Sequence, residues 1–425
     1  MVNLDAPSIL PALGLIAATL VEFSAVSMNP GFDIRSLADQ AQSLPTHSWE
    51  YGTAAQALLE LYNPELSVFG ASPFPVPTVA PDDIRALSYA ASTIRLGKGY
   101  SALAAGNGAA GDPASLGVSA VMLGKTNSTF AKAAKDTWDG LWNDVPRFKN
   151  GAISHRANVP ELWADFMYMA PPFLAYYAAD KEDLEGLQDA VEQCRLYRQV
   201  LQPNVTGQYK GIWMHIIGPQ SQDTELWATG NAWAAAGMSR VLATVMKASF
   251  ISNLAWKQQA ITDLTSYIKE IVDGVMKTSM DDKLLRNYLS DMESSGHGFG
   301  EISGSSLLAA TVYRMAVLQP QAFGSKYVTW AEGIRGTLSG KDADGNPHIT
   351  RTGIATPAVN PLAWKDTKPF TKGSPEGQAF VVLMYAAWRD CVKANVCDPL
   401  PATEVGEVHA SKRAHHARRH FSHKH

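Results

Sequence analysis

The sequence predicts an all-α protein, an (α/α)6 barrel in which six helical hairpins close into a ring. Apolar residues repeat with helical spacing along most of the chain, and the period-two alternation of strands is scarce. Helices followed by loops recur about every 50 to 60 residues, so six hairpins would occupy nearly all of residues 36–398. We therefore expect a closed ring rather than an open solenoid, although no clear sequence repeat supports either.

The expected helices are separated by loops rich in Gly, Pro and aromatic residues. They cover Trp49–Tyr62, Asp83–Ala104, Ser115–Leu123, Phe130–Trp142, Glu161–Ala178, Leu184–Val200, Ala232–Met246, Asn253–Lys277, Ser305–Val317 and Gly377–Lys393. In a ring of hairpins the inner helices point one end at a shared bowl, and long loops form its wall. A ligand is expected to bind in that bowl.

Length and composition indicate a soluble globular protein with a large core. The chain has 425 residues, of which 46% are hydrophobic and 18% charged. One extended domain is as compatible with these values as two or three small ones. We divide the chain into an N-terminal segment at residues 1–35, a catalytic helical ring at 36–398 and a basic, His-rich tail at 399–425.

The charge is distributed unevenly along the chain. Residues 409–425 hold five Lys or Arg and six of the 11 His, and the remainder has 31 basic against 40 acidic residues. An acidic body argues against a nucleic-acid enzyme, which needs basic residues over its folded surface. The tail has almost no apolar residues for packing, so we expect a solvated, disordered end rather than a site for metal or polyanions.

The N-terminal segment has two open interpretations. Residues 8–21 have the length of the apolar region of a secretion signal and are followed by small residues, but the start lacks Lys and Arg and carries Asp5. A cleaved signal and a packed N-terminal helix both remain possible. No stretch has the roughly 20 uninterrupted apolar residues of a membrane span, so no membrane partner is expected.

Cysteines and glycosylation triplets favour a secreted protein. Asn127 and Asn204 each begin an acceptor triplet, although such triplets also arise by chance. Cys391 and Cys397 are close enough to pair in an oxidising compartment. Extracellular localisation is therefore expected.

One acidic residue lies among large apolar side chains. Pro160 suits the first turn of a helix, and Asp165 then falls about one turn in, beside Trp163 and Phe166. A carboxylate in such surroundings is costly unless it is paired or protonated, which suggests a proton donor. The alternative is an Asp that stabilises the helix N-terminus through the macrodipole.

A second acidic residue and a basic pair lie earlier in the chain. Asp112 follows a Gly-rich stretch and precedes Pro113, as expected of an N-cap. If the ring brings Asp112 near Asp165, repulsion between the two charges raises one pKa and leaves a protonated acid at neutral pH. His155 and Arg156 could meet an anionic substrate, or could be an exposed, solvated pair.

Aromatic residues are frequent in residues 211–238, which include Trp213, His215, Trp227 and Trp233. Indole faces suit the apolar faces of sugar rings, and indole N–H groups can donate to hydroxyls. The alternative is that the tryptophans belong to the core and that His215 is a buried, hydrogen-bonded residue.

These segments resemble the unsaturated glycuronyl hydrolases of glycoside hydrolase family 105, which are six-hairpin glycosidases. The most specific similarity is Trp163-Ala-Asp165-Phe-Met-Tyr-Met-Ala-Pro-Pro172-Phe173, which is similar to the helix that carries the family's catalytic acid. Other similar elements within residues 45–395 are Asp112-Pro-Ala-Ser-Leu-Gly117, His155-Arg156, Gly211-Ile-Trp213-Met-His215, Trp227-Ala-Thr229-Gly230-Asn231-Ala232-Trp233 and Trp49-Glu-Tyr51-Gly52.

The resemblance implies a substrate that ends in a 4,5-unsaturated uronic acid, the product of a polysaccharide lyase, such as an unsaturated rhamnogalacturonan fragment. Protonation and hydration of its C4=C5 enol ether would release that sugar. The implied catalytic residues are Asp165 as acid and Asp112 as the residue that tunes it. The implied substrate-binding residues are Tyr51, His155, Arg156, Trp163, His215, Trp227 and Trp233. No metal or cofactor is implied.

Two positions depart from the family pattern. Thr229 stands where the family usually has an arginine that helps hold the substrate, and no Asp follows His215 as closely as it commonly does. These departures bear on the substrate more than on the fold. A polysaccharide lyase with a Tyr or His base, a conventional glycosidase, and a carbohydrate-binding protein without turnover therefore remain alternatives.

Overall fold

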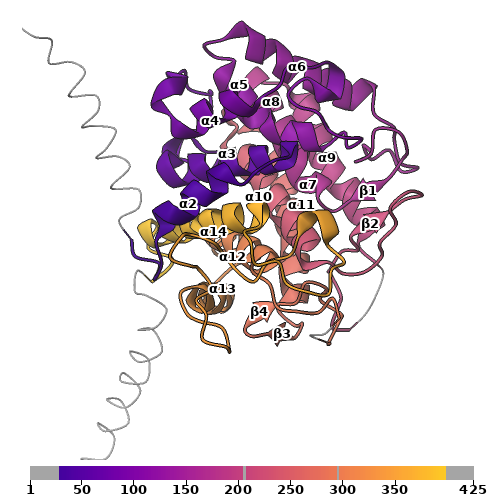
Figure 1. Ribbon diagram of the computed structural model, residues 1–425. Helices are drawn as coiled ribbons and strands as arrows, with labels where there is room; N and C mark the ends of the chain where they lie inside the picture. The colour runs from indigo at the N-terminus through magenta and orange to yellow at the C-terminus, as the bar shows by residue number, and fades with distance from the viewer. Residues whose placement is uncertain (1–27, 204–206, 294–295, 399–425) are drawn as a thin grey trace, which may run out of the picture.

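The computed structural model describes residues 28–203, 207–293 and 296–398. Within these residues, six inner helices form a closed ring in which each contacts the next and the last returns to the first. They are α3 (Ser48–Tyr62), α5 (Gly117–Leu123), α8 (Pro171–Lys181), α10 (Ala228–Lys247), α12 (Ile302–Leu318) and α14 (Pro375–Lys393). The prediction of an all-α ring of helical hairpins is confirmed, and α14 lies beside α2 and α3 where the ring closes (Figure 1).

Six outer helices pack against the inner ring. They are α2 (Ile34–Ser43), α4 (Arg85–Thr93), α6 (Ser128–Asn143), α9 (Leu184–Leu201), α11 (Ala255–Val275) and α13 (Ser325–Leu338). The outer helices bury one stripe, as in α11, whereas inner helices such as α12 are buried nearly all round. None of the helices in the described ranges is both long and apolar enough to cross a bilayer.

Short elements connect the helices around the ring. Two antiparallel strand pairs are formed by β1 (Leu162–Trp163) with β2 (Ile216–Ile217) and by β3 (Met280–Asp281) with β4 (Leu284–Leu285). One further helix, α7 (Phe166–Met169), precedes α8. The 3-10 helices are η1 (Pro64–Leu66), η2 (Pro81–Asp83), η3 (Gly99–Ser101), η4 (Asp112–Leu116), η5 (Ser249–Ile251) and η6 (Pro361–Ala363).

Several expected elements differ from those observed. The predicted helix Glu161–Ala178 is wrong, because Leu162–Trp163 pairs with Ile216–Ile217 as a strand and the helical part begins only at Phe166. The predicted helix Asp83–Ala104 is too long, since α4 ends at Thr93. The helices α2 and α13 were not expected. The apolar residues 8–21 and the tail 399–425 lie outside the described residues.

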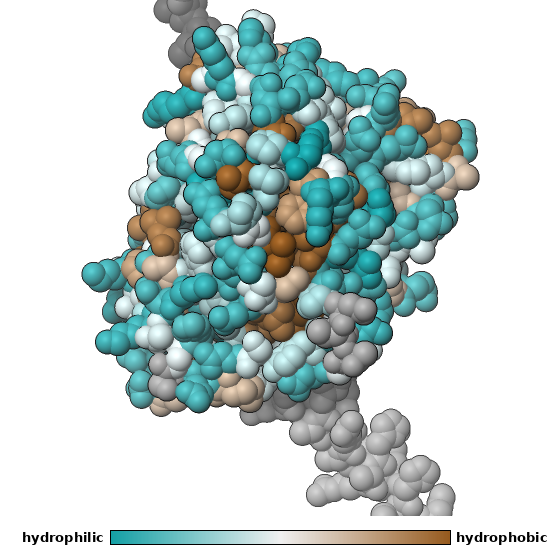
Figure 2. All heavy atoms as spheres, turned by 90° about the vertical axis from the view of Figure 1, so that its right-hand side faces the viewer, coloured by the Kyte–Doolittle hydropathy of each residue, from teal (hydrophilic) through white to brown (hydrophobic). Residues whose placement is uncertain are grey.

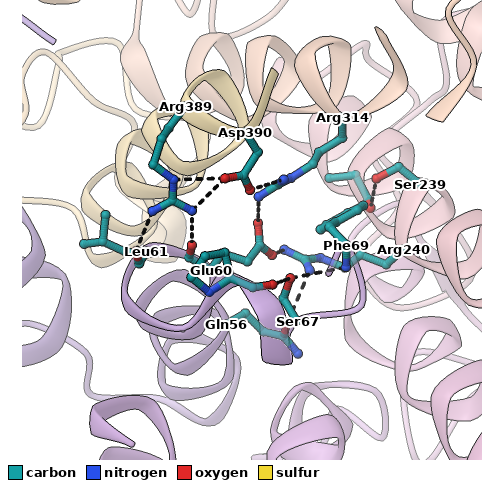
Figure 3. A network of polar contacts seen from close by, with 12 residues as sticks. Gln56, Glu60, Leu61, Ser67, Phe69, Ser239, Arg240, Arg314, Arg389 and Asp390 are labelled. Atoms are coloured by element: carbon teal, nitrogen blue, oxygen red, sulfur yellow. Dashed lines mark hydrogen bonds and ion pairs between the residues drawn. The ribbon is translucent and has the colours of Figure 1, made fainter. Parts of the chain in front are cut away.

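The inner helices α3, α10, α12 and α14 all run in the same sense through the ring. Residues at the start of α3 and α14 and the residue just before α10 line the cavity described below. Glu60, Arg240, Arg314 and Asp390, near the other ends of the four helices, meet in a buried charge cluster (Figure 3). About 12 residues of helix span roughly 18 Å, so the cavity and the cluster lie at opposite ends of the ring.

The buried charge cluster pairs guanidinium groups with carboxylates from four helices. The Nη1 and Nη2 atoms of Arg314 lie 2.6 Å from Asp390 Oδ2 and 2.8 Å from Glu60 Oε2. Glu60 also pairs with Arg240. The Phe69 ring contacts both guanidinium groups, with its centroid 4.3 Å from Cζ of Arg314 and 5.3 Å from Cζ of Arg240. The cluster therefore ties α3, α10, α12 and α14 together at the end of the ring opposite the cavity.

Candidate active site

A cavity of about 260 Å³ opens at the ends of the inner helices. Figure 2 shows the face that lies at the right of Figure 1, where β1 and β2 are, and hydrophobic residues gather near its centre among hydrophilic ones. The cavity brings together seven of the nine residues predicted from the sequence: Asp112, His155, Arg156, Trp163, Asp165, His215 and Trp227.

Asp165 lies at the start of α7, with its side chain directed at His215. It occupies the N-cap position of this four-residue helix and makes no side-chain capping bond, so the predicted place one turn into a helix is wrong. Its Oδ2 atom lies 3.3 Å from Nε2 of His215, and the Asp165 side chain is 15% exposed. The carboxylate that the sequence singled out is thus an ion-pair partner on the cavity wall.

His215 lies between two carboxylates. Its Nδ1 atom is 3.1 Å from Oδ2 of Asp223, on the side of the ring opposite Asp165. Burial acts to lower the pKa of His215, but the contacts with Asp165 and Asp223 outweigh burial and raise it. Burial likewise acts to raise the pKa of Asp223, yet its hydrogen bonds with His215 and Tyr288 hold that pKa below its usual value. The two carboxylates therefore favour the charged form of His215 and hold its ring from both sides.

Asp223 supplies the acid beside His215 that the sequence does not place directly after it. No acid follows His215 within a few residues, but the backbones of Ile216 and Asp223 exchange hydrogen bonds of 2.7 and 3.0 Å. This pairing turns the chain back, so that an acid eight residues later reaches the imidazole. Sequence spacing alone could not reveal this pair, because it depends on a turn between the two residues.

Asp112 is the first residue of η4 and is almost fully buried. The prediction that it caps the following helix is wrong, because α5 begins at Gly117 and the Asp112 side chain makes no capping bond. Burial and then the charge of Asp165 raise the pKa of Asp112 to about 8, against the opposing effect of Arg156. This pKa favours the protonated form of Asp112 at neutral pH.

The loop before Asp112 is aligned with the His155-Arg156 segment by backbone hydrogen bonds. The Ala110 amide donates to the His155 carbonyl at 2.6 Å, and the Ala157 amide donates to the Gly108 carbonyl at 2.9 Å. Gly108 has a φ of +89°, and a Cβ atom there would lie 2.7 Å from Nη2 of Arg156. This glycine therefore lets the guanidinium of Arg156 pack against the loop.

His155 and Arg156 differ in charge. The His155 ring stacks on Trp163 with the centroids 4.8 Å apart, and its Nε2 atom lies 3.7 Å from Oδ1 of Asp112. Burial lowers the pKa of His155 to about 4, helped by Arg156 and opposed by Asp165, so His155 is neutral at pH 7. Among the described residues that line the cavity, Arg156 is the only Lys or Arg.

The aromatic wall differs in part from the predicted one. Trp163 and Trp227 line the cavity, together with Trp49 and Trp364, which sequence reasoning did not single out. The predicted wall residues Tyr51 and Trp233 are not brought to the cavity. Tyr51 packs edge-on against Tyr89, and Trp233 is fully buried between Tyr168 and Phe380.

A third carboxyl group, that of Glu376 at the start of α14, also borders the cavity. Its Oε1 atom accepts from Trp49 Nε1 at 2.9 Å, and burial followed by the charge of Asp165 raises its pKa well above the usual value.

Thr229, at the position of the family arginine, is buried and its hydroxyl lies 3.4 Å from Glu301. Within the described ranges, no three His, Cys, Asp or Glu side chains are grouped so that they could hold a metal ion.

A closed ring of helical hairpins, with acidic side chains and tryptophans around a cavity at one end, defines a helical-barrel carbohydrate-active enzyme class. More particularly, the chain belongs to Glycosyl Hydrolase Family 88, whose family model matches residues 118–389. That range contains Asp165, His215 and Asp223, whereas Asp112 lies just before it.

Known relatives are distant in sequence and similar in fold. The unsaturated rhamnogalacturonyl hydrolase YesR of Bacillus subtilis is 26% identical over 127 residues, and this match covers 27% of the chain and only 35% of YesR. A possible family 105 member from Salmonella enterica superposes with a TM-score of 0.61 at 15% identity, over 84% of this chain and 94% of that one. A family 105 glycoside hydrolase from C. acetobutylicum gives 0.62 at 14% identity, over 84% and 99%.

Proposed function

We propose that the protein is a glycoside hydrolase that releases a terminal 4,5-unsaturated uronic acid from oligosaccharides produced by a polysaccharide lyase. The observation that carries this proposal is the Asp165–His215 ion pair, which faces an aromatic cavity that also contains the protonated Asp112. Family membership and the name of the Bacillus relative support the same reaction class.

The proton for the reaction is available at Asp165 because of His215. Nε2 of His215 lies 3.3 Å from Oδ2 of Asp165, so the imidazole can pass a proton to this carboxylate, which then delivers it to the substrate. Asp165 transfers this proton to C4 of the enol ether, which leaves oxocarbenium character at C5 and the ring oxygen. Asp223, on the other side of the imidazole, accepts from Nδ1–H of His215 and so stabilises the proton on Nδ1.

Hydration completes the reaction. A water molecule adds to C5 and gives its proton to Asp165, which thus serves first as acid and then as base. The hemiketal at C5 opens when the bond from C5 to the ring oxygen breaks. C1 then carries a hydroxyl and the aglycone, and this hemiacetal breaks down to release the aglycone as an alcohol. Neutral Asp112 orients the sugar ring without adding a second negative charge beside Asp165.

The uronate carboxylate is placed by Arg156. His155 is neutral and can contribute a hydrogen bond but no charge, and Thr229 supplies no cation. Trp163, Trp227 and Trp364 offer indole faces to the sugar ring. A substrate with a single carboxylate therefore matches Arg156, the single Lys or Arg among the described cavity residues.

We expect wild-type protein to consume the ultraviolet absorbance of the C4=C5 enol when it is mixed with lyase-digested rhamnogalacturonan or glycosaminoglycans. The rate should be constant around neutral pH and fall as the pH rises through about 8, because Asp112 then loses its proton and gains a charge beside Asp165. A polysaccharide lyase would instead create this absorbance from intact polymer. A conventional glycosidase or a binding protein would leave it unchanged, and either result contradicts the proposal.

We further propose that the protein is secreted and glycosylated. Cys391 and Cys397 form a disulfide bond, which is typical of oxidising compartments, and Asn127 is exposed at the start of α6. The second triplet, at Asn204, lies outside the described residues. We expect chain recovered from the culture medium of its source organism to show the disulfide and glycan by mass spectrometry. Chain found only inside cells, with both thiols reduced, would contradict this expectation.

A further inference from the structure

We propose that Asp223 is the positioning residue of this site: one buried carboxylate orients His215 toward Asp165 and seats Trp364 as a cavity wall. The inference rests on the proposed function, since it assigns how the proton-donating pair is assembled. Asp223 itself does not line the cavity, and its side chain is only 1% exposed. It therefore acts through the residues that it holds.

Three side-chain donors from separate parts of the chain converge on one oxygen. Oδ2 of Asp223 accepts from Nδ1 of His215 at 3.1 Å, from the hydroxyl of Tyr288 at 2.6 Å and from Nε1 of Trp364 at 3.3 Å. The other oxygen, Oδ1, accepts from the Glu225 amide at 3.2 Å. So many donors on one buried carboxylate hold it ionised and fix the orientation of each partner.

The contact with Asp223 determines which nitrogen of His215 faces the cavity. Because Nδ1–H donates to Asp223, Nε2 is left to face Asp165 at 3.3 Å. A carboxylate behind a histidine in this way selects the tautomer and favours the charged ring. The titratable or charged groups that surround the imidazole, directly or through Asp223, are Asp165, Asp223, His155, Tyr288 and Lys365.

Backbone pairing gives these contacts a rigid frame. Asp223 is paired with Ile216, next to His215, and Trp227 forms a backbone bridge with Tyr288. Main-chain hydrogen bonds thus fix the segments that carry two of the donors, His215 and Tyr288. Their common acceptor cannot move without disturbing both.

The same carboxylate extends to the loop that forms one cavity wall. The Trp364 carbonyl accepts from Asn287 Nδ2 at 2.9 Å, and its indole N–H donates to Asp223. The Trp364 ring then lies edge-on to His215 and Trp163, with centroid distances of 5.4 and 5.6 Å. Asp223 therefore couples the proton-donating pair to the surface against which a sugar ring packs.

The test compares full-length wild type, Asp223→Asn and the control Asp342→Asn. Asp342 is a partly exposed aspartate that accepts from the Asp344 and Asn346 amides in a loop outside the cavity. We expect Asp223→Asn to lower kcat about ten- to a hundredfold, the range for partners behind a liganding or catalytic histidine. In this variant His215 should lose its proton before Asp112 does, so the alkaline limit of the pH–rate profile should move lower than in wild type. Asp342→Asn should change neither quantity.

Histidine-selective NMR gives a readout that needs no substrate. The His215 signals, assigned with His215→Gln, should show both ring nitrogens protonated at neutral pH in wild type. In Asp223→Asn the imidazole should lose one of these two protons at a lower pH than in wild type. If wild type turns over no unsaturated oligosaccharide, the proposed function fails while this titration still tests Asp223. A folded Asp223→Asn protein whose His215 titrates as in wild type, or whose pH–rate profile is unshifted, overturns the proposal.

Discussion

Asp165→Asn is expected to fold normally and to lose at least about a hundredfold in kcat on an unsaturated uronyl oligosaccharide, the usual scale for loss of general acid catalysis. The amide has the shape of the carboxyl group and still contacts Nε2 of His215, but it can neither carry the proton to C4 nor accept one from water. The effect should fall on kcat more than on KM, because the proton is transferred in the transition state and not in the bound ground state.

The comparison should include far-ultraviolet circular dichroism and the thermal midpoint of both proteins. Asp165 makes no side-chain capping bond and repels Asp112, which offsets the loss of its ion pair with His215, so the substitution should change stability little. The pKa of Asp112 should fall in Asp165→Asn, because the charge of Asp165, the second-largest of the causes that raise it, is removed. Wild-type turnover by a folded Asp165→Asn protein would remove this residue from the mechanism.

Glu60→Ala is expected to give the largest loss of stability, about 3–5 kcal/mol in the free energy of unfolding. Glu60 is almost fully buried and is paired with both Arg240 and Arg314 (Figure 3). Arg314 keeps Asp390 when Glu60 is removed, but Arg240 is left as a buried cation without its carboxylate. Urea denaturation followed by tryptophan fluorescence measures the change.

Glu192→Ala is the matched control for this prediction. Glu192 pairs with Arg195 on the outer helix α9, and both side chains are 42% exposed. An exposed pair of this kind contributes about 0–1 kcal/mol, so the control should unfold close to wild type. If Glu60→Ala loses no more stability than Glu192→Ala, the buried charge cluster does not hold the ring together.

The sequence predicted the ring of hairpins because helical periodicity is a local property. Leu184–Val200, for example, was expected within one residue of the observed α9, since its apolar stripe is long and uninterrupted. The helix α13 escaped notice because Gly333 and Gly336 interrupt it. Its buried residues Tyr327, Ala331, Ile334 and Leu338 nevertheless have helical spacing, so the signal was present.

The segment before Asp165 shows what local periodicity cannot predict. Leu162 and Trp163 belong to a strand only because Leu162 faces Ile217 across an antiparallel pair, 55 positions away in sequence. This long-range pairing overrides the helix that Pro160 and the apolar residues suggest. It also places Asp165 at the turn after the strand, where its side chain faces the cavity.

The choice of aromatic residues failed for a geometric reason. Trp227 and Trp233 are six residues apart, and at about 100° per residue their side chains cannot share one face of a helix, so Trp233 points into the core. Trp49 and Tyr51, two residues apart, likewise face different sides, and it is Trp49 that reaches the cavity. The helical angle alone shows that only one residue of each pair can line the cavity, but it does not show which one.

The most direct test of proton delivery by Asp165 is to determine which carbon of the substrate receives the proton. Wild-type reaction in deuterated water, followed by NMR at early times, should give a product with one deuterium delivered to a single face of C4 and no remaining vinyl signal of the C4=C5 bond. The same mixture with Asp165→Asn should keep that vinyl signal. Release of the aglycone by wild type with the vinyl signal intact would mean cleavage at C1 by another route, and would contradict proton delivery by Asp165.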